Sequence, residues 1–194
     1  MEGCEVSSED YSKVRNMKRI FVDTETTGTS KMSRIVELAY ALYDDRAEID
    51  RYSELVKPED FQIPQKSIDV HGITQEKAME GEPLEKVIDD FITACEEADL
   101  LIAHNTSFDM NVILYEMKRT ENYDILEIPV DSAYCTMRGL TQYCDLPDNK
   151  WPSLEELYEK VFDEKPDQTH RALDDLDLLT DCYFELLDRS VIED

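Results

Sequence analysis

Positive charge is scarce in this chain of 194 residues. Lysine and arginine together number 20, against 46 aspartates and glutamates, so the formal net charge at pH 7 is −26. Nonspecific nucleic-acid binding normally needs a basic surface. Composition alone therefore argues against a nucleic-acid partner.

Cysteines and long apolar runs are also few. The five cysteines are odd in number and form no C-x-x-C pair, which argues against a disulfide framework and a zinc site. A reducing, intracellular setting is expected, cytoplasmic by default, with the nucleus left open. No stretch reaches the roughly 20 apolar residues of a membrane span. The first ten residues are acidic and polar, unlike a signal peptide.

The overall composition and length are typical of one globular domain. Hydrophobic residues make up 41% of the chain and charged residues 34%, and this length can bury a sizeable core. Residues 1–16 show no hydrophobic periodicity and are predicted to form a disordered arm. The domain is then expected to span residues 17–190.

Three β-rich segments follow the arm, at residues 18–23, 34–43 and 49–57. The middle one, RIVELAYALY, is ambiguous between helix and strand, and its short spacing to its neighbours favours a strand. Three strands with short connections predict an antiparallel meander.

Helices and strands alternate in the rest of the chain. Apolar residues recur at helical spacing over residues 83–98, 107–119, 136–143, 154–162 and 172–188. Short strands are expected at residues 100–103 and 128–134. Strands followed by strand–helix alternation predict one mixed α/β sheet.

A pair of carboxylates closes the first predicted strand. Asp23 and Glu25 are two residues apart, so both point to the same face of a strand. Like charges this close raise each other's pKa, and a hard divalent cation between them relieves the repulsion. An acidic pair also caps turns, and the pair alone does not decide between the two roles.

Two later segments bring further candidate groups. The segment AHNTSFD, residues 103–109, leaves a buried strand and enters a helix, which places Asp109 near the first helical turn. The segment HRALDD, residues 170–175, opens the last helix, and Asp175 can face the sheet beside Leu179. His170 and Asp175 are roughly 140° apart around a helix. They meet at one site only if His170 lies in the preceding loop.

In order and spacing, these segments resemble the three motifs of the DEDDh exonucleases. That family includes the proofreading subunit of bacterial DNA polymerase III, the TREX nucleases and ribonuclease T. The motifs are FVDTETTG at residues 21–28, AHNTSFD and HRALDD, and the segments VHGIT and WPSLEEL are similar to stretches of proofreading members. The resemblance covers residues 18–188. It implies an RNase H-like α/β fold with three antiparallel strands, two parallel strands and helices on both faces.

The resemblance also implies a metal-dependent 3′→5′ exonuclease that releases nucleoside 5′-monophosphates. Asp23, Glu25, Asp109 and Asp175 would hold two Mg²⁺ or Mn²⁺ ions, and His170 would be the general base. Thr26 and Thr27 would contact the terminal 3′-OH through backbone N–H groups. The pocket for the last nucleotide would be shaped by His104, Asn105 and Phe108.

The sequence does not decide which substrate the protein acts on. DNA with single-stranded or frayed 3′ ends is the first expectation, an RNA-trimming exoribonuclease is the alternative, and a non-catalytic nucleic-acid or polymerase-binding module is a remoter one. Two divalent cations would offset only four of the negative charges, so substrate binding is expected to be weak, salt-sensitive and distributive. A small basic track near the pocket, or a partner such as a polymerase, would supply the missing positive charge. The predicted track consists of Lys31, Arg34, Arg138 and Lys150.

Overall fold

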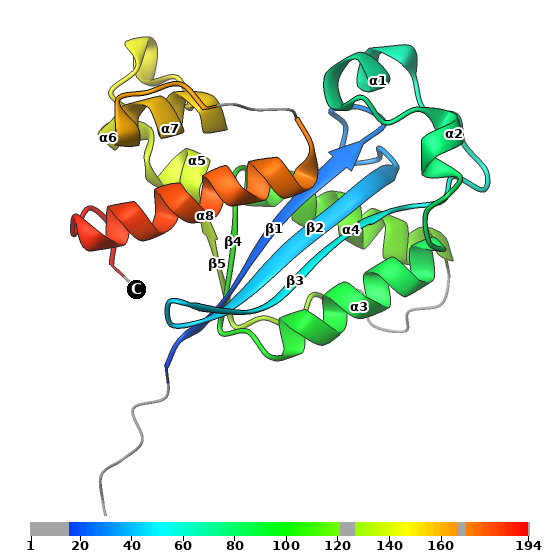
Figure 1. Ribbon diagram of the computed structural model, residues 1–194, viewed down its shortest axis with the longest axis horizontal. Coiled ribbons are helices and arrows are strands. Elements are labelled where there is room, and N and C mark those ends of the chain that lie inside the picture. Colours follow the sequence, from blue (N-terminus) through cyan, green and yellow to red (C-terminus); the bar gives the residue numbers. More distant parts are fainter. Residues whose placement is uncertain (1–15, 121–126, 167–169, 194) are drawn as a thin grey trace, which may run out of the picture.

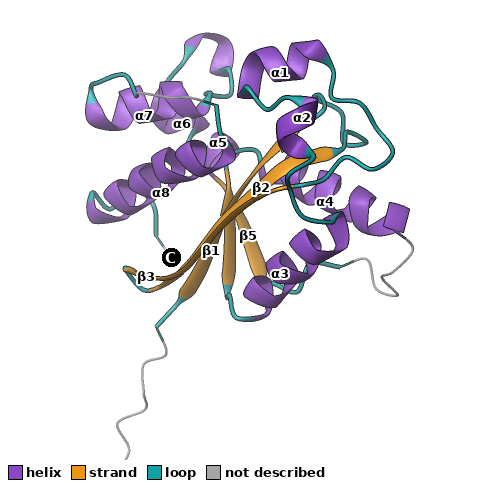
Figure 2. Ribbon diagram, turned by 45° about the vertical axis from the view of Figure 1, so that its right-hand side comes forward, coloured by secondary structure: helices purple, strands orange, loops and turns teal. Residues whose placement is uncertain are grey.

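A five-stranded sheet forms the centre of the computed structural model, which describes residues 16–120, 127–166 and 170–193. The predicted disordered arm lies outside these residues, apart from Asn16. The strands are β1 (Lys18–Thr26), β2 (Ile35–Asp44), β3 (Ala47–Leu55), β4 (Leu100–Ala103) and β5 (Ser132–Cys135). They lie in the order β3-β2-β1-β4-β5 (Figures 1 and 2).

The pairing confirms the predicted mixed sheet. β1 pairs with β2 and β2 with β3 in antiparallel fashion, whereas β4 lies parallel to β1 and β5 parallel to β4. The ambiguous segment RIVELAYALY is a strand, because β2 lies between two others and is buried over eight residues from Ile35 to Leu42. β3 is an edge strand and is largely exposed, as its polar sequence requires.

Helices cover both faces of the sheet, as predicted (Figure 1). Ile20 and Val22 of β1 pack on the face that carries α3 (Leu84–Glu96) and α4 (Thr106–Thr120). Phe21 points to the opposite face. The helices on that face are α5 (Thr136–Gly139), α6 (Thr141–Cys144), α7 (Leu154–Phe162) and α8 (Ala172–Asp188).

Two predicted elements differ from the observed ones. The helix expected over residues 136–143 is two short helices, α5 and α6, with the break at Leu140, whose backbone is not helical. The strand expected from residue 128 begins only at Ser132. Pro129 has no N–H to give to a ladder, and the chain turns around it with the Val130 N–H donating to the Ile128 carbonyl at 2.9 Å.

Three short helices were not expected: α1 (Gln65–His71), α2 (Gln75–Ala78) and the 3₁₀ helix η1 (Pro147–Asn149). α1 buries only Ser67 and His71, so it has no apolar stripe that periodicity can reveal. It lies beside the end of β1 (Figure 1). None of the helices that the structure describes is both long enough and apolar enough to cross a membrane.

Candidate active site

Three carboxylates converge where β1 ends. Asp23 and Glu25 lie two and four residues after Phe21 and therefore point to the face of the sheet that α8 covers. Asp175 stands in the first turn of α8. One carboxylate oxygen from each of the three residues lies within 4.8 Å of the other two. The fold thus brings together side chains that are 152 residues apart in the sequence.

Asp109 approaches the same point from the opposite face of β1. Thr24, between the two acidic residues, points toward α4, and its hydroxyl donates to Asp109 Oδ1 at 2.7 Å. Asp109 is only 3% exposed and occupies the first turn of α4, where the helix dipole favours negative charge. It is not one of the three residues whose oxygens lie within 4.8 Å of one another.

The electrostatics of this cluster favour a bound cation. Burial raises the pKa of Asp23 well above its ordinary value, and the charges of Asp109 and Asp175 raise that pKa further. Burial, followed by the charges of Asp175 and Glu37, raises the pKa of Glu25 to about 8. Hard oxygen donors crowded in this way match the ligand preference of Mg²⁺ and Mn²⁺. The residues present therefore fit a divalent metal.

His170 lies in the loop immediately before α8, as the geometry of a shared site requires. Its side chain is exposed, and its backbone adopts a left-handed conformation with φ of 52°. Residues 167–169, directly upstream, lie outside the described residues.

A buried ion pair anchors the start of α8. Glu37, on β2, is 2% exposed and lies directly across the sheet from Glu25. It accepts hydrogen bonds from Arg171 Nε at 2.9 Å and Arg171 Nη2 at 2.5 Å, and from the Ala172 N–H at 3.2 Å. This contact ties the residue after His170 to the sheet. Sequence reasoning missed it, although a glutamate inside a buried strand was an available indication.

A cleft of about 520 Å³ adjoins Glu25. Thr26, Thr27 and Phe108, three of the five predicted substrate-binding residues, line it. α1 supplies the opposite wall, with His71 among its lining residues. The sequence analysis singled out the segment VHGIT, which begins with Val70 and His71 of this wall, but not the helix itself, because α1 lacks apolar periodicity.

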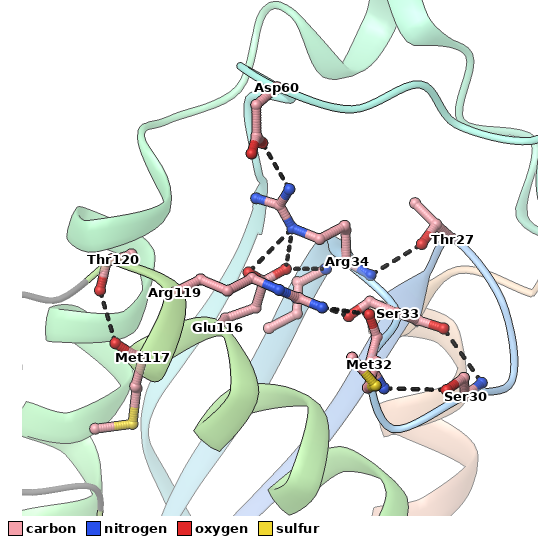
Figure 3. Close-up of polar contacts among 11 residues, drawn as sticks. Thr27, Ser30, Met32, Ser33, Arg34, Asp60, Glu116, Met117, Arg119 and Thr120 are labelled. Atoms are coloured by element: carbon pink, nitrogen blue, oxygen red, sulfur yellow. Dashed lines mark hydrogen bonds and ion pairs between the residues drawn. The ribbon is translucent and has the colours of Figure 1, made fainter.

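The turn after β1 is held by Arg34 (Figure 3). Arg34 Nε donates to both oxygens of buried Glu116, at 2.9 and 3.1 Å, and Arg34 Nη1 contacts Asp60 at 2.6 Å. The Thr27 hydroxyl accepts from the Arg34 N–H at 2.9 Å, and the Thr27 N–H donates to the Arg34 carbonyl at 2.9 Å. The Thr27 amide is thus already engaged, contrary to the prediction that it contacts a nucleotide.

His104 and Asn105 make contacts within the scaffold. His104 Nδ1 lies 3.0 Å from Thr136 Oγ1, and His104 Nε2 lies 3.0 Å from the Pro152 carbonyl oxygen. Burial lowers the pKa of His104 to about 4, so the ring is neutral at pH 7. Asn105 has a positive φ of 81°, and its carbonyl accepts from the Phe108 N–H at the start of α4. Neither residue lines the cleft.

The predicted basic track does not form as expected. Arg34 is bound by Glu116 and Asp60, and Lys150 Nζ lies 2.6 Å from Glu156 Oε1. Lys31 lies over the Tyr115 ring and Arg138 over the Trp151 ring. Half of the expected positive charge is therefore neutralised by carboxylates.

Comparison with known proteins identifies the family to which this chain belongs. The family model RNase_T, described as an exonuclease, matches residues 20–183. DNA polymerase III subunit epsilon of Pasteurella multocida is 28% identical, over 87% of this chain and 68% of its own length. DNA polymerase III PolC-type of Thermotoga petrophila is 26% identical over 91% of this chain, which spans only 12% of that relative.

Solved structures of exonucleases are similar to this one. Exonuclease X in complex with 5′ overhanging duplex DNA is 26% identical with a TM-score of 0.67, over 90% of this chain and 94% of that one. E. coli exonuclease I bound to single-stranded DNA shares the fold, with a TM-score of 0.73 at 20% identity, over 90% of this chain and 41% of that one. The chain belongs to the exonuclease family, in its DEDDh, DnaQ-like group.

Proposed function

We propose that residues 17–190 form a metal-dependent 3′→5′ exonuclease that hydrolyses the terminal phosphodiester bond of DNA and releases nucleoside 5′-monophosphates. The observation that carries this proposal is the convergence of Asp23, Glu25 and Asp175 within 4.8 Å beside a cleft. Membership of the exonuclease family supplies the reaction class.

The carboxylates have distinct places in this proposal. Asp23, Glu25 and Asp175, together with Asp109, whose charge acts on Asp23, would hold two Mg²⁺ or Mn²⁺ ions. Such ions, when bound, activate a water and stabilise the leaving oxyanion. Thr24 holds the Asp109 carboxylate toward Asp23 through its hydroxyl.

His170 is the proposed general base. An imidazole accepts a proton near neutral pH, and the exposed loop before α8 leaves this ring open to solvent water. The Glu37–Arg171 ion pair fixes the adjacent backbone, which limits how far His170 can move from Asp175.

The cleft is the proposed site of the 3′-terminal nucleotide. Phe108 and Val70 offer apolar surface to a base, and the Thr27 hydroxyl offers a donor to the sugar. DNA is favoured over RNA because the relatives of highest coverage are named as subunits of DNA polymerases or as bound to DNA. Those relatives also favour a polymerase as the protein partner.

Matched single-stranded DNA and RNA oligonucleotides with a 5′ label test the proposal. With Mg²⁺ or Mn²⁺, the DNA should shorten one nucleotide at a time from its 3′ end, and EDTA should stop the reaction. Faster shortening of RNA would support the exoribonuclease alternative. Internal cleavage, or cleavage that persists in EDTA, would refute the metal-dependent exonuclease. Retention of the oligonucleotide without cleavage would support the binding module.

A further inference from the structure

The single tryptophan of the chain lies exposed on the segment between η1 and α7. Trp151 retains 55% of its accessible surface. Its backbone is well supported, because α7 begins three residues later with a capping box in which Ser153 and Glu156 satisfy each other's N–H groups. A large aromatic ring held out on a rigid segment is typical of a contact surface.

Trp151 lies near the end of the sheet that carries the carboxylate cluster. The next residue, Pro152, contacts His104 through its carbonyl oxygen at 3.0 Å. β4 runs parallel to β1 with Ile102 beside Phe21, so His104, which follows the last residue of β4, lies at the same end of the sheet as Asp23. Figures 1 and 2 show α7 and α1 at this end, with the Asp175 end of α8 between them.

Arg138 lies beside the exposed Trp151 ring. Its guanidinium carbon lies 5.1 Å from the centroid of the Trp151 ring, a distance typical of cation–π stacking. Among the residues that the structure describes, Arg138 forms no ion pair. Within residues 16–120, 127–166 and 170–193 the guanidinium thus contacts an exposed ring and no carboxylate in an ion pair, on a protein whose net charge is −26.

We propose that Trp151 and Arg138 form a second nucleotide-binding site, which takes a nucleotide upstream of the scissile bond in single-stranded substrate. Trp151 stacks on the base, and Arg138 contacts the neighbouring phosphate. This inference rests on the proposed exonuclease function. Stacking explains how so acidic a chain holds a polyanion, because base–aromatic contacts do not depend on positive charge and tolerate any base sequence.

Intrinsic fluorescence tests the contact directly, because Trp151 is the only tryptophan. The parent protein is titrated with a labelled single-stranded DNA octamer in Ca²⁺, used in place of Mg²⁺ to prevent cleavage. Tryptophan emission should be quenched with the same midpoint as the rise in anisotropy of the label. A rise in anisotropy without a change in emission would overturn the inference.

Kinetics of three variants complete the test. The measured quantity is the ratio of kcat/KM for the octamer to kcat/KM for the p-nitrophenyl ester of thymidine 5′-monophosphate, which has no upstream base. Trp151→Ala should lower this ratio about 5- to 100-fold, whereas Trp151→Phe should lower it less than about threefold. Ile49→Ala, which removes another exposed apolar side chain near the far end of the sheet, should leave the ratio unchanged.

The outcomes separate the two proposals. A parent protein that cleaves neither substrate refutes the exonuclease function, and the second nucleotide-binding site with it. A parent that cleaves both, with the same ratio in Trp151→Ala, refutes only the second site.

Discussion

At the scale of single residues, side-chain alternation along β1 decides which groups meet. Asp23 and Glu25 point toward α8, while Thr24 points toward α4 and holds Asp109. A shift of one residue would exchange the two faces and scatter the carboxylates. The bulge between Glu25 and Thr26 comes only after both acidic residues have been placed.

Asp175→Asn tests the carboxylate cluster. We expect kcat to fall on the order of 10²- to 10³-fold, because one charged oxygen ligand is lost. The metal-free variant should melt at a higher temperature than the parent, since a repulsive charge near Asp23 and Glu25 is removed. Asp181→Asn, on an exposed position of the same helix, is the control for turnover and should leave kcat unchanged. Parent-like turnover by Asp175→Asn would contradict the assignment.

His170→Gly separates catalysis from stability. Glycine adopts the observed φ of 52° without strain, so the free energy of unfolding should change by less than about 1 kcal/mol. Turnover should fall about 10²- to 10⁴-fold if the imidazole is the general base, with Mn²⁺ affinity retained. Calorimetry of Mn²⁺ binding and single-turnover kinetics measure the two effects. Loss of Mn²⁺ binding would make His170 a ligand rather than a base.

At the scale of elements, the position of α8 depends on one buried ion pair. Glu37 and Arg171 are 134 residues apart in the sequence, and their contact joins the start of α8 to β2. Removing Arg171 leaves the Glu37 carboxylate charged and poorly solvated, which typically costs about 3–5 kcal/mol, whereas Arg171 keeps 30% of its side chain exposed and is better solvated when Glu37 is lost. The ion pair therefore positions both His170 and Asp175.

A double-mutant cycle tests this ion pair. Glu37→Leu and Arg171→Met should each destabilise the fold and lower kcat, with KM changed much less. The double variant should recover part of the stability, because no uncompensated charge remains. It should not recover kcat, since α8 loses its anchor. Denaturant unfolding and steady-state kinetics measure both, and additive stability changes would show that the two residues act independently.

The elements differ in how far the sequence predicts them. The predicted ranges of α7 and α8 agree with the structure, because an apolar stripe is a property of one segment, and α7 also carries a local capping box. α1 was missed because it buries only two residues, neither of them apolar. The carboxylate pair was visible as D-x-E, whereas the Glu37–Arg171 contact and the cleft depend on tertiary packing that no local pattern encodes.

At the scale of the whole molecule, stability and metal binding are linked through pH. Glu25 has an ordinary pKa of 4.5 and a pKa of about 8 in the folded, metal-free protein, so the native state binds more protons than the unfolded state between these values. Its contribution to stability is present below the lower value and is lost as the pH rises toward the higher one. Asp23 and Asp109 shift in the same direction.

The expected result is a lower Tm in EDTA at about pH 8 than at about pH 6. Mg²⁺ should raise Tm more at the higher pH, because the carboxylates are then ready to bind it. Glu25→Gln should flatten the pH dependence. Thermal scans with and without EDTA measure these changes, and a Tm that increases with pH in EDTA would contradict the raised pKa values.

The wide separation of Asp23 and Asp175 along the chain has a consequence for biosynthesis. Domains generally fold as the chain emerges during translation, starting from the N-terminal side. A nascent chain that has exposed the sheet and α4 already holds Asp23, Glu25 and Asp109, yet it lacks His170 and Asp175. The growing polypeptide should therefore be unable to cut the nucleic acids around the ribosome until α8 has docked.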